Sequence, residues 1–88
     1  MKNYPNKDPE TLYKIDKVID ARRLMCPGPI LMLSSSLTNM PQGSIIMVIA
    51  RDPAFEEDLK SWSVYTGNEI LELRRNGEEI IAIVKKSR

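Results

Sequence analysis

Two apolar runs constrain the fold of this 88-residue chain more than any other feature. One is "SIIMVIA", residues 44–50, and the other is "EEIIAIVKK", residues 78–86. Both have the length of a strand, and both carry aliphatic side chains at successive positions, so each strand would bury its two faces. Such strands are typical of the centre of a sheet. The remaining elements must therefore flank and cover them.

Two charged segments are predicted to be the edges of this sheet. "KIDKVID", residues 14–20, and "EILELRR", residues 69–75, mix aliphatic residues with acids and bases. Charge on a strand protects an exposed edge from pairing with other chains. The strand that follows residues 69–75 is joined to it by Asn76-Gly77, a dipeptide that favours a tight hairpin with positive φ at both turn positions.

Two segments between the strands have the apolar spacing of one-faced helices. The first begins near Pro27 and stops at "PQG", residues 41–43. The second begins at Asp52, whose carboxylate can accept from free amides, and Gly67 can close it. The buried faces are predicted to carry Ile30, Leu33, Leu37 and Met40 in the first helix, and Phe55, Leu59 and Trp62 in the second.

The order of elements is therefore strand, helix, strand, helix, strand, strand. Right-handed crossovers make the first two strands parallel, and the hairpin makes the last two antiparallel. We predict an open two-layer α/β sandwich, with a mixed four-stranded sheet of order 1-2-4-3 and both helices on one face. Residues 14–86 form this single domain, and residues 1–13 form a flexible tail. The sheet face without helices is expected to leave an apolar patch for a second copy or a partner.

Composition excludes several classes of function. The chain has one cysteine, no histidine and a net charge of +1. An internal disulfide is impossible, a metal site is disfavoured, and direct nucleic-acid binding lacks the usual basic excess. The apolar run "IIMVIA" is too short for membrane insertion, and no signal peptide is evident at the N-terminus. A free thiol under these conditions fits the cytoplasm.

The single cysteine, Cys26, lies where the first strand gives way to the first helix. Pro27 and Pro29 fix the backbone there, and Gly28 leaves space beside the sulfur and offers the nearest amide donor. A thiol at a helix start is predicted to have a lowered pKa and to act as a nucleophile. The competing interpretation is a buried cysteine that only fills the core.

Three arginines are predicted to lie near this thiol. The carboxyl ends of parallel strands meet at one edge of the sheet, where open α/β folds commonly bind ligands. Arg22, Arg23 and Arg51 lie in loops at that edge. There they would favour a thiolate and attract an anionic group or an acidic partner.

The segment "DARRLMCPGPILML", residues 20–33, resembles the cysteine-proline-x-proline signature of the TusA/SirA-like small proteins. The resemblance runs from Ile15 to Val84, and it includes "DPAFEEDLKSW", residues 52–62, and "TGNEILEL", residues 66–73. It implies the same strand-helix-strand-helix-strand-strand sandwich, which is like the C-terminal half of translation initiation factor three.

The resemblance also implies sulfur transfer. In this family the motif cysteine, here Cys26, holds a sulfane sulfur as a persulfide or a thiosulfonate and passes it on, without a metal or a cofactor. The implied partners are a sulfur donor, such as a cysteine desulfurase or a rhodanese-like or DsrE-like protein, and a sulfur-acceptor protein. The sequence leaves the donor, the acceptor and the pathway open, and it fits a monomer or a weak homodimer.

The alternative is a nucleic-acid-binding module or a regulatory adaptor with a redox-sensitive cysteine. Fold analogy alone suggests the first of these. The second could not form an intramolecular disulfide, because no second cysteine is present to resolve a sulfenic acid.

Overall fold

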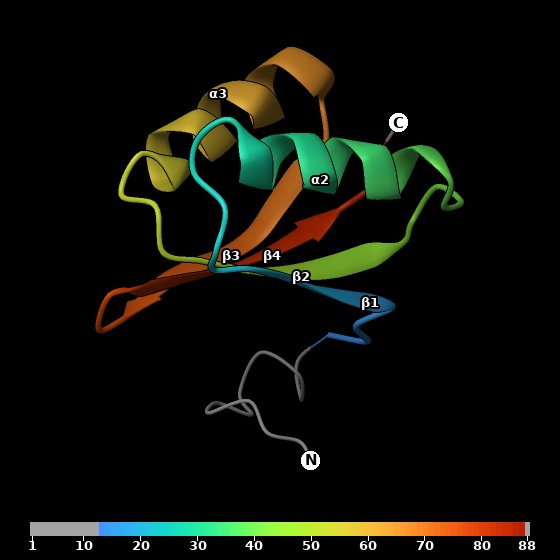
Figure 1. Cartoon of the computed structure of the whole chain (residues 1–88). Coiled ribbons are helices and arrows are strands. Elements are labelled where there is room, and N and C mark those ends of the chain that lie inside the picture. Colours follow the sequence, from blue (N-terminus) through green and yellow to red (C-terminus); the bar gives the residue numbers. More distant parts are fainter. Residues whose placement is uncertain (1–12, 88) are drawn as a thin grey trace.

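The computed structural model describes residues 13–87, and within that range the chain forms four strands and two helices (Figure 1). The predicted tail therefore lies outside the described residues, except for Tyr13. β1 runs parallel to β2, β4 pairs antiparallel with both β2 and β3, and the strand order is β1-β2-β4-β3. This confirms the predicted topology. The elements are β1 (Lys17–Ala21), α2 (Gly28–Thr38), β2 (Ile45–Ala50), α3 (Phe55–Thr66), β3 (Glu69–Asn76) and β4 (Glu79–Lys85).

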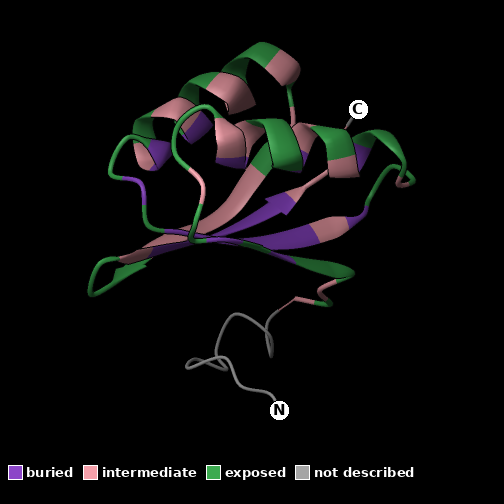
Figure 2. Cartoon of the chain, viewed as in Figure 1, coloured by how far each residue is buried: buried purple, intermediate pink, exposed green. Residues whose placement is uncertain are grey.

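Both helices cover the same face of the sheet, as predicted, and the main core lies between the two layers (Figures 1 and 2). Alternate side chains of the strands point into this layer because side chains of a strand alternate between its faces. The buried residues of this core include Ile19, Ile46, Val48, Ile80, Ala82 and Val84 from the sheet and Leu33, Leu37, Phe55 and Leu59 from the helices.

The ends of the helices are fixed by contacts from elsewhere in the chain. α2 ends at Thr38, and the Lys86 ammonium donates to the carbonyl oxygens of Leu37 and Met40 at 2.8 Å each. A cation is favourable there because the last carbonyls of a helix lack partners within it. α3 ends at Thr66, and its C-cap Gly67 has a left-handed φ of 82°, as predicted.

The hairpin between β3 and β4 differs by one residue from the prediction. Asn76 still pairs with Glu79, so the two-residue loop is Gly77-Glu78. Gly77 has a φ of 66°, and among the described residues only glycines have positive φ. A glycine at the first loop position followed by a residue of negative φ is the pattern of a type II′ turn. The glycine was identified correctly, but its position in the turn was not.

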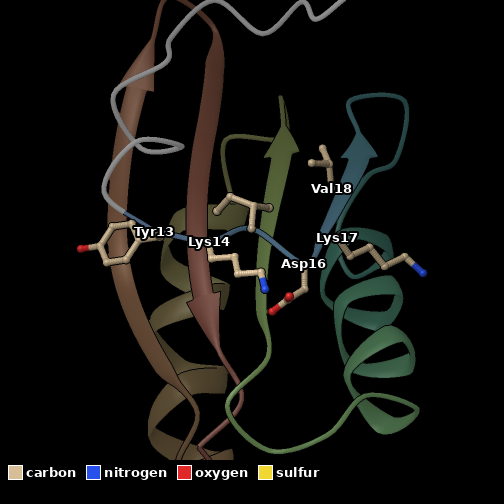
Figure 3. Close-up of a pocket in the computed structure, with 6 residues that line it drawn as sticks. Tyr13, Lys14, Asp16, Lys17 and Val18 are labelled. Atoms are coloured by element: carbon tan, nitrogen blue, oxygen red, sulfur yellow. The ribbon is translucent and has the colours of Figure 1, made fainter.

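The sheet face opposite the helices is not an exposed apolar patch, and that prediction was wrong. Its central side chains are 0–4% exposed, namely Met47, Ile49, Ile81 and Ile83. Tyr13 and Ile15 pack against them, because the chain before β1 crosses this face instead of extending the edge strand (Figure 3). Asp16 holds this segment in place, since its N–H donates to the Ile45 oxygen at 2.8 Å and its carboxylate accepts the Ile45 N–H at 2.9 Å.

Neither of the helices in residues 13–87 has the length and hydropathy that crossing a membrane requires.

Candidate functional site

Cys26 lies in the loop of residues 22–27, between β1 and α2, and its side chain is exposed. Pro27 is the N-cap of α2, so Cys26 lies one residue before the cap. The Cys26–Pro27 peptide bond is cis. Of the two interpretations of this residue, the structure excludes the core filler, because a sulfur that serves the core would be buried. An exposed thiol next to a helix start is available to another molecule.

Gly28 has a different role from the predicted one. Its N–H donates to the carbonyl oxygen of Met25 at 2.6 Å, so this amide closes the loop and does not serve the sulfur. A β-carbon on Gly28 would lie 3.1 Å from that of Leu24, a tighter approach than most real contacts. Leu24 in turn packs against the main core, and Pro29 is buried in the first turn of α2. The small residue therefore lets the helix start close onto the loop.

Asp52 connects this loop to the start of α3. Its side chain is only 5% exposed. One carboxylate oxygen accepts the Cys26 N–H at 2.5 Å, and the other accepts the Ala54 N–H at 3.1 Å. The sequence predicted the second contact, a bond to the free amides before a helix, and missed the first. Hydrogen bonds in which a backbone amide donates to an ionised carboxylate are among the stronger hydrogen bonds in proteins.

Asp58, in the first turn of α3, binds the thiol itself. The Cys26 sulfur donates to the Asp58 carboxylate over 2.6 Å. This hydrogen bond raises the pKa of the Cys26 thiol, and desolvation and the negative charges of Asp58 and Asp52 raise it further. The predicted lowering of the pKa is therefore wrong. The groups that raise this pKa are the carboxylates of Asp58 and Asp52, together with desolvation.

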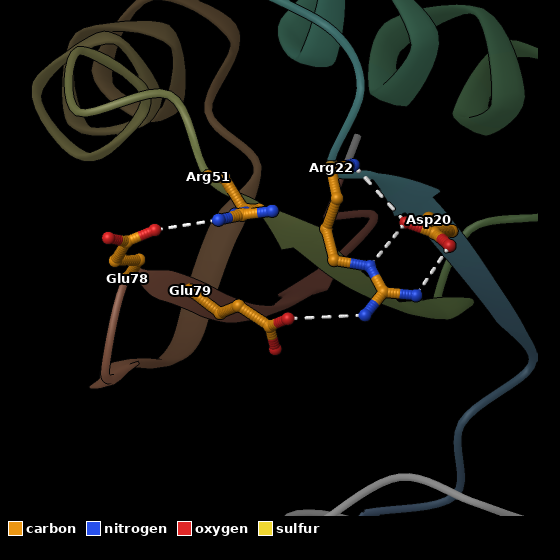
Figure 4. A network of polar contacts seen from close by, with 5 residues as sticks. All are labelled: Asp20, Arg22, Arg51, Glu78 and Glu79. Atoms are coloured by element: carbon orange, nitrogen blue, oxygen red, sulfur yellow. Dashed lines mark hydrogen bonds and ion pairs between the residues drawn. The ribbon is translucent and has the colours of Figure 1, made fainter.

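Two of the three arginines near the carboxyl edge of the sheet, Arg22 and Arg51, pair with acids (Figure 4). Arg22 binds both carboxylate oxygens of Asp20 at 2.8 Å and reaches Glu79 at 3.1 Å. Arg51 pairs with Glu78 at 2.6 Å. The side-chain hydrogen bonds from Arg22 lower the pKa of Asp20 to about 2. Glu78 and Glu79 of the β3–β4 hairpin thus offset positive charge that the sequence analysis expected to act on the thiol.

The structure does gather the three predicted arginines into one place. Arg22, Arg23 and Arg51, together with Asp20, line a shallow hollow of about 380 Å³, which we call the arginine hollow. None of them is among the groups that shift the pKa of Cys26. The charged groups that shift it are Asp58 and Asp52, and the binding of an anion or an acidic partner by the three arginines stays a prediction.

No cluster of three or more histidine, cysteine, aspartate or glutamate side chains in residues 13–87 is placed to hold a metal ion. The site instead consists of one exposed thiol, a carboxylate that accepts its proton in a hydrogen bond, and a second carboxylate that fixes its backbone. Such an arrangement can form and break bonds to sulfur at Cys26.

Comparison with known proteins gives consistent matches. The family model "Sulfurtransferase TusA" matches residues 17–86. A relative from Allochromatium vinosum, named "Sulfur carrier protein TusA", is 38% identical over 72 residues, which are 82% of this chain and 95% of that protein. One of the same name from Pseudomonas syringae is 35% identical over 74 residues, covering 83% of this chain and 88% of that protein. A relative from Aquifex aeolicus is 36% identical over 84% of this chain, which spans only 38% of its length.

Proposed function

Because the chain belongs to the TusA family of sulfurtransferases, we propose that Cys26 carries a sulfane sulfur, as a persulfide or a thiosulfonate, and passes it to a partner protein. The single observation that supports this most is the exposed Cys26 thiol, the one cysteine of the chain, held on a loop before α2. In this proposal Pro27, Gly28 and Pro29 shape the loop that presents the sulfur.

The transfer is a thiol–persulfide exchange. The Cys26 sulfur attacks the outer sulfur of a donor persulfide, a new S–S bond forms on Cys26, and the S–S bond of the donor breaks. The donor leaves as a thiolate and takes up the proton that Cys26 gave up. One thiol and one persulfide therefore give one persulfide and one thiol. This exchange needs no external oxidant and no resident cofactor.

The partners in this proposal are two classes of protein in the cytoplasm. One is a sulfur donor, such as a cysteine desulfurase or a rhodanese-like or DsrE-like protein, and the other is a sulfur acceptor. The arginine hollow supports a contact with an acidic group of the donor or the acceptor, because Arg22, Arg23 and Arg51 line it together. The carrier itself works as a monomer or a weak homodimer.

The experiment is intact mass spectrometry after exposure to a low-molecular-weight persulfide that carries an ammonium group, such as cysteamine persulfide. The wild-type chain should gain the mass of one sulfur atom, and a thiol reductant should remove it. Cys26→Ser should gain none, because a hydroxyl does not form the persulfide. This variant should remain folded, since its backbone N–H keeps Asp52 and its hydroxyl can donate to Asp58. Equal sulfur uptake by the serine variant, or no uptake by the wild type, would overturn the proposal.

A further inference from the structure

We propose that Asp58 is a positioning residue for this chemistry, which holds the unloaded Cys26 as a thiol and makes it react selectively with sulfur donors that carry positive charge. The inference rests on the proposed function and adds to it a residue and a charge preference. It identifies the donor by chemistry, as one that presents a cation beside the sulfur it gives.

The chemistry of the two groups decides which of them donates the hydrogen bond. The Cys26 sulfur and the Asp58 carboxylate are 2.6 Å apart, and an ionised carboxylate can only accept. The hydrogen of this bond therefore belongs to the sulfur, and the bond exists only while Cys26 is a thiol. The Asp52 carboxylate accepts the Cys26 N–H at 2.5 Å, so Cys26 is held toward the start of α3 at two points, its backbone N–H and its sulfur.

The charges around the sulfur act in one direction. α3 contributes Asp58 and the turn before α3 contributes Asp52, and both are acids. Of the basic residues in the cysteine loop and in the turn after β2, Arg22 and Arg51 pair with Asp20, Glu79 and Glu78. Arg23 also lies in the cysteine loop, and none of the three arginines is among the groups that shift the pKa of Cys26. A thiolate at this place would lose its hydrogen bond and face two carboxylates.

This arrangement has a consequence for the choice of reagent. A cation that approaches the sulfur also approaches Asp58 and offsets its charge, which favours the thiolate at the moment of attack. An anion meets the opposite effect. The unloaded carrier should therefore be slow with neutral reagents, slower with anionic ones and fastest with cationic ones.

The first test is the rate of alkylation by iodoacetamide, a neutral reagent, as a function of pH. Asp58→Asn should move the midpoint to lower pH and raise the rate at pH 7 by about three- to tenfold. Glu57→Gln is the matched control, because Glu57 also lies in the first turn of α3 and is exposed. Its profile should coincide with that of the wild type. An Asp58→Asn profile that also coincides with the wild type would overturn the proposal.

The second test uses two methanethiosulfonate reagents that differ in charge, the aminoethyl cation and the sulfonatoethyl anion. With each, Cys26 attacks the sulfenyl sulfur, a mixed disulfide forms and methanesulfinate leaves. The wild type should react faster with the cation, and the ratio of rates should fall about threefold or more in Asp58→Asn and fall with added salt. The salt series needs no variant. A ratio near one in the wild type, or one unchanged by the variant, contradicts the proposal.

Neither test involves a persulfide. If the sulfur uptake described above fails while these two succeed, Asp58 controls a thiol with another role. If uptake succeeds and these fail, the carrier function stands without this control.

Discussion

A carboxylate oxygen of Asp58 lies 2.6 Å from the sulfur of Cys26. The folded chain holds the thiol proton more tightly than the unfolded chain, because the pKa of Cys26 is raised. This bond therefore stabilises the fold fully below the ordinary cysteine pKa of about 8.5, and the contribution is lost as pH rises through the higher pKa of the folded state.

The arginine hollow gives a prediction at the same scale. Replacing Arg22, Arg23 and Arg51 together by alanine should leave the alkylation midpoint of Cys26 unchanged, because none of the three shifts the pKa of this thiol. The same variant should weaken transfer from or to a partner that uses the hollow. Iodoacetamide rates against pH check the first part. A midpoint that rises in the triple variant would restore the arginines as supports of the thiolate.

Sequence reasoning placed Cys26 correctly between the first strand and the first helix, and it missed Asp58, whose carboxylate accepts from the sulfur. The cysteine is easy to select as a candidate, because it is the one cysteine of the chain and lies between arginines and prolines. Asp58 is 32 residues away in the chain and sits in an acidic turn, "EED", that any solvated helix start can carry. A usable signal was present in the topology. Both crossovers place the start of their helix at the same edge of the sheet, so the first turn of α3 had to lie near the cysteine loop.

At the scale of the elements, hydrogen bonds to Asp52 connect the cysteine loop to the start of α3, and this connection leads to a prediction. Asp52→Ala should lower the free energy of unfolding by about 1–3 kcal/mol, because it leaves the amides of Cys26 and Ala54 without their acceptor. It should also speed alkylation, since the loop no longer holds the sulfur toward Asp58.

Urea denaturation measures this change in the free energy of unfolding. Asp52→Asn is the partner variant, because its amide oxygen keeps one of the two bonds, and its loss should fall between wild type and alanine. Asp20→Ala is the surface control, since Asp20 is exposed and its ion pair with Arg22 should contribute less than about 1 kcal/mol. Equal losses of unfolding free energy for Asp52→Ala and Asp20→Ala would show that the buried carboxylate contributes no more to stability than an exposed one.

The order and pairing of the strands could be predicted because the composition of each strand indicates whether it lies in the centre or at the edge of the sheet. β2 and β4 are aliphatic at successive positions and lie in the centre, while the charged strands β1 and β3 lie at the edges. The turn of the β3–β4 hairpin was off by one residue because Gly77 satisfies two turn types, and the choice between them depends on the pairing of Asn76 with Glu79. That pairing is set by the packing of both strands.

For the whole molecule, the covered faces of the sheet predict weak self-association. The helices cover one face, and the central residues of the other are buried, with Tyr13, Ile15, Ile45 and Leu71 packed against them. Sedimentation equilibrium at micromolar concentration should therefore give a mass near that of one chain, 10.1 kDa. A stable dimer under these conditions would require a different surface from the sheet face that the sequence suggested.

The strand order also sets when the sheet can be completed during synthesis. β4 is the last of the four described strands to be made, yet it pairs with both β2 and β3. Until Glu79–Lys85 has left the ribosome, the aliphatic strand β2 has only β1 beside it among these strands, and β3 has no neighbour at all. Such an uncovered strand is a site for aggregation. Folding of this domain must therefore close its long-range pairings together, after β4 has been made.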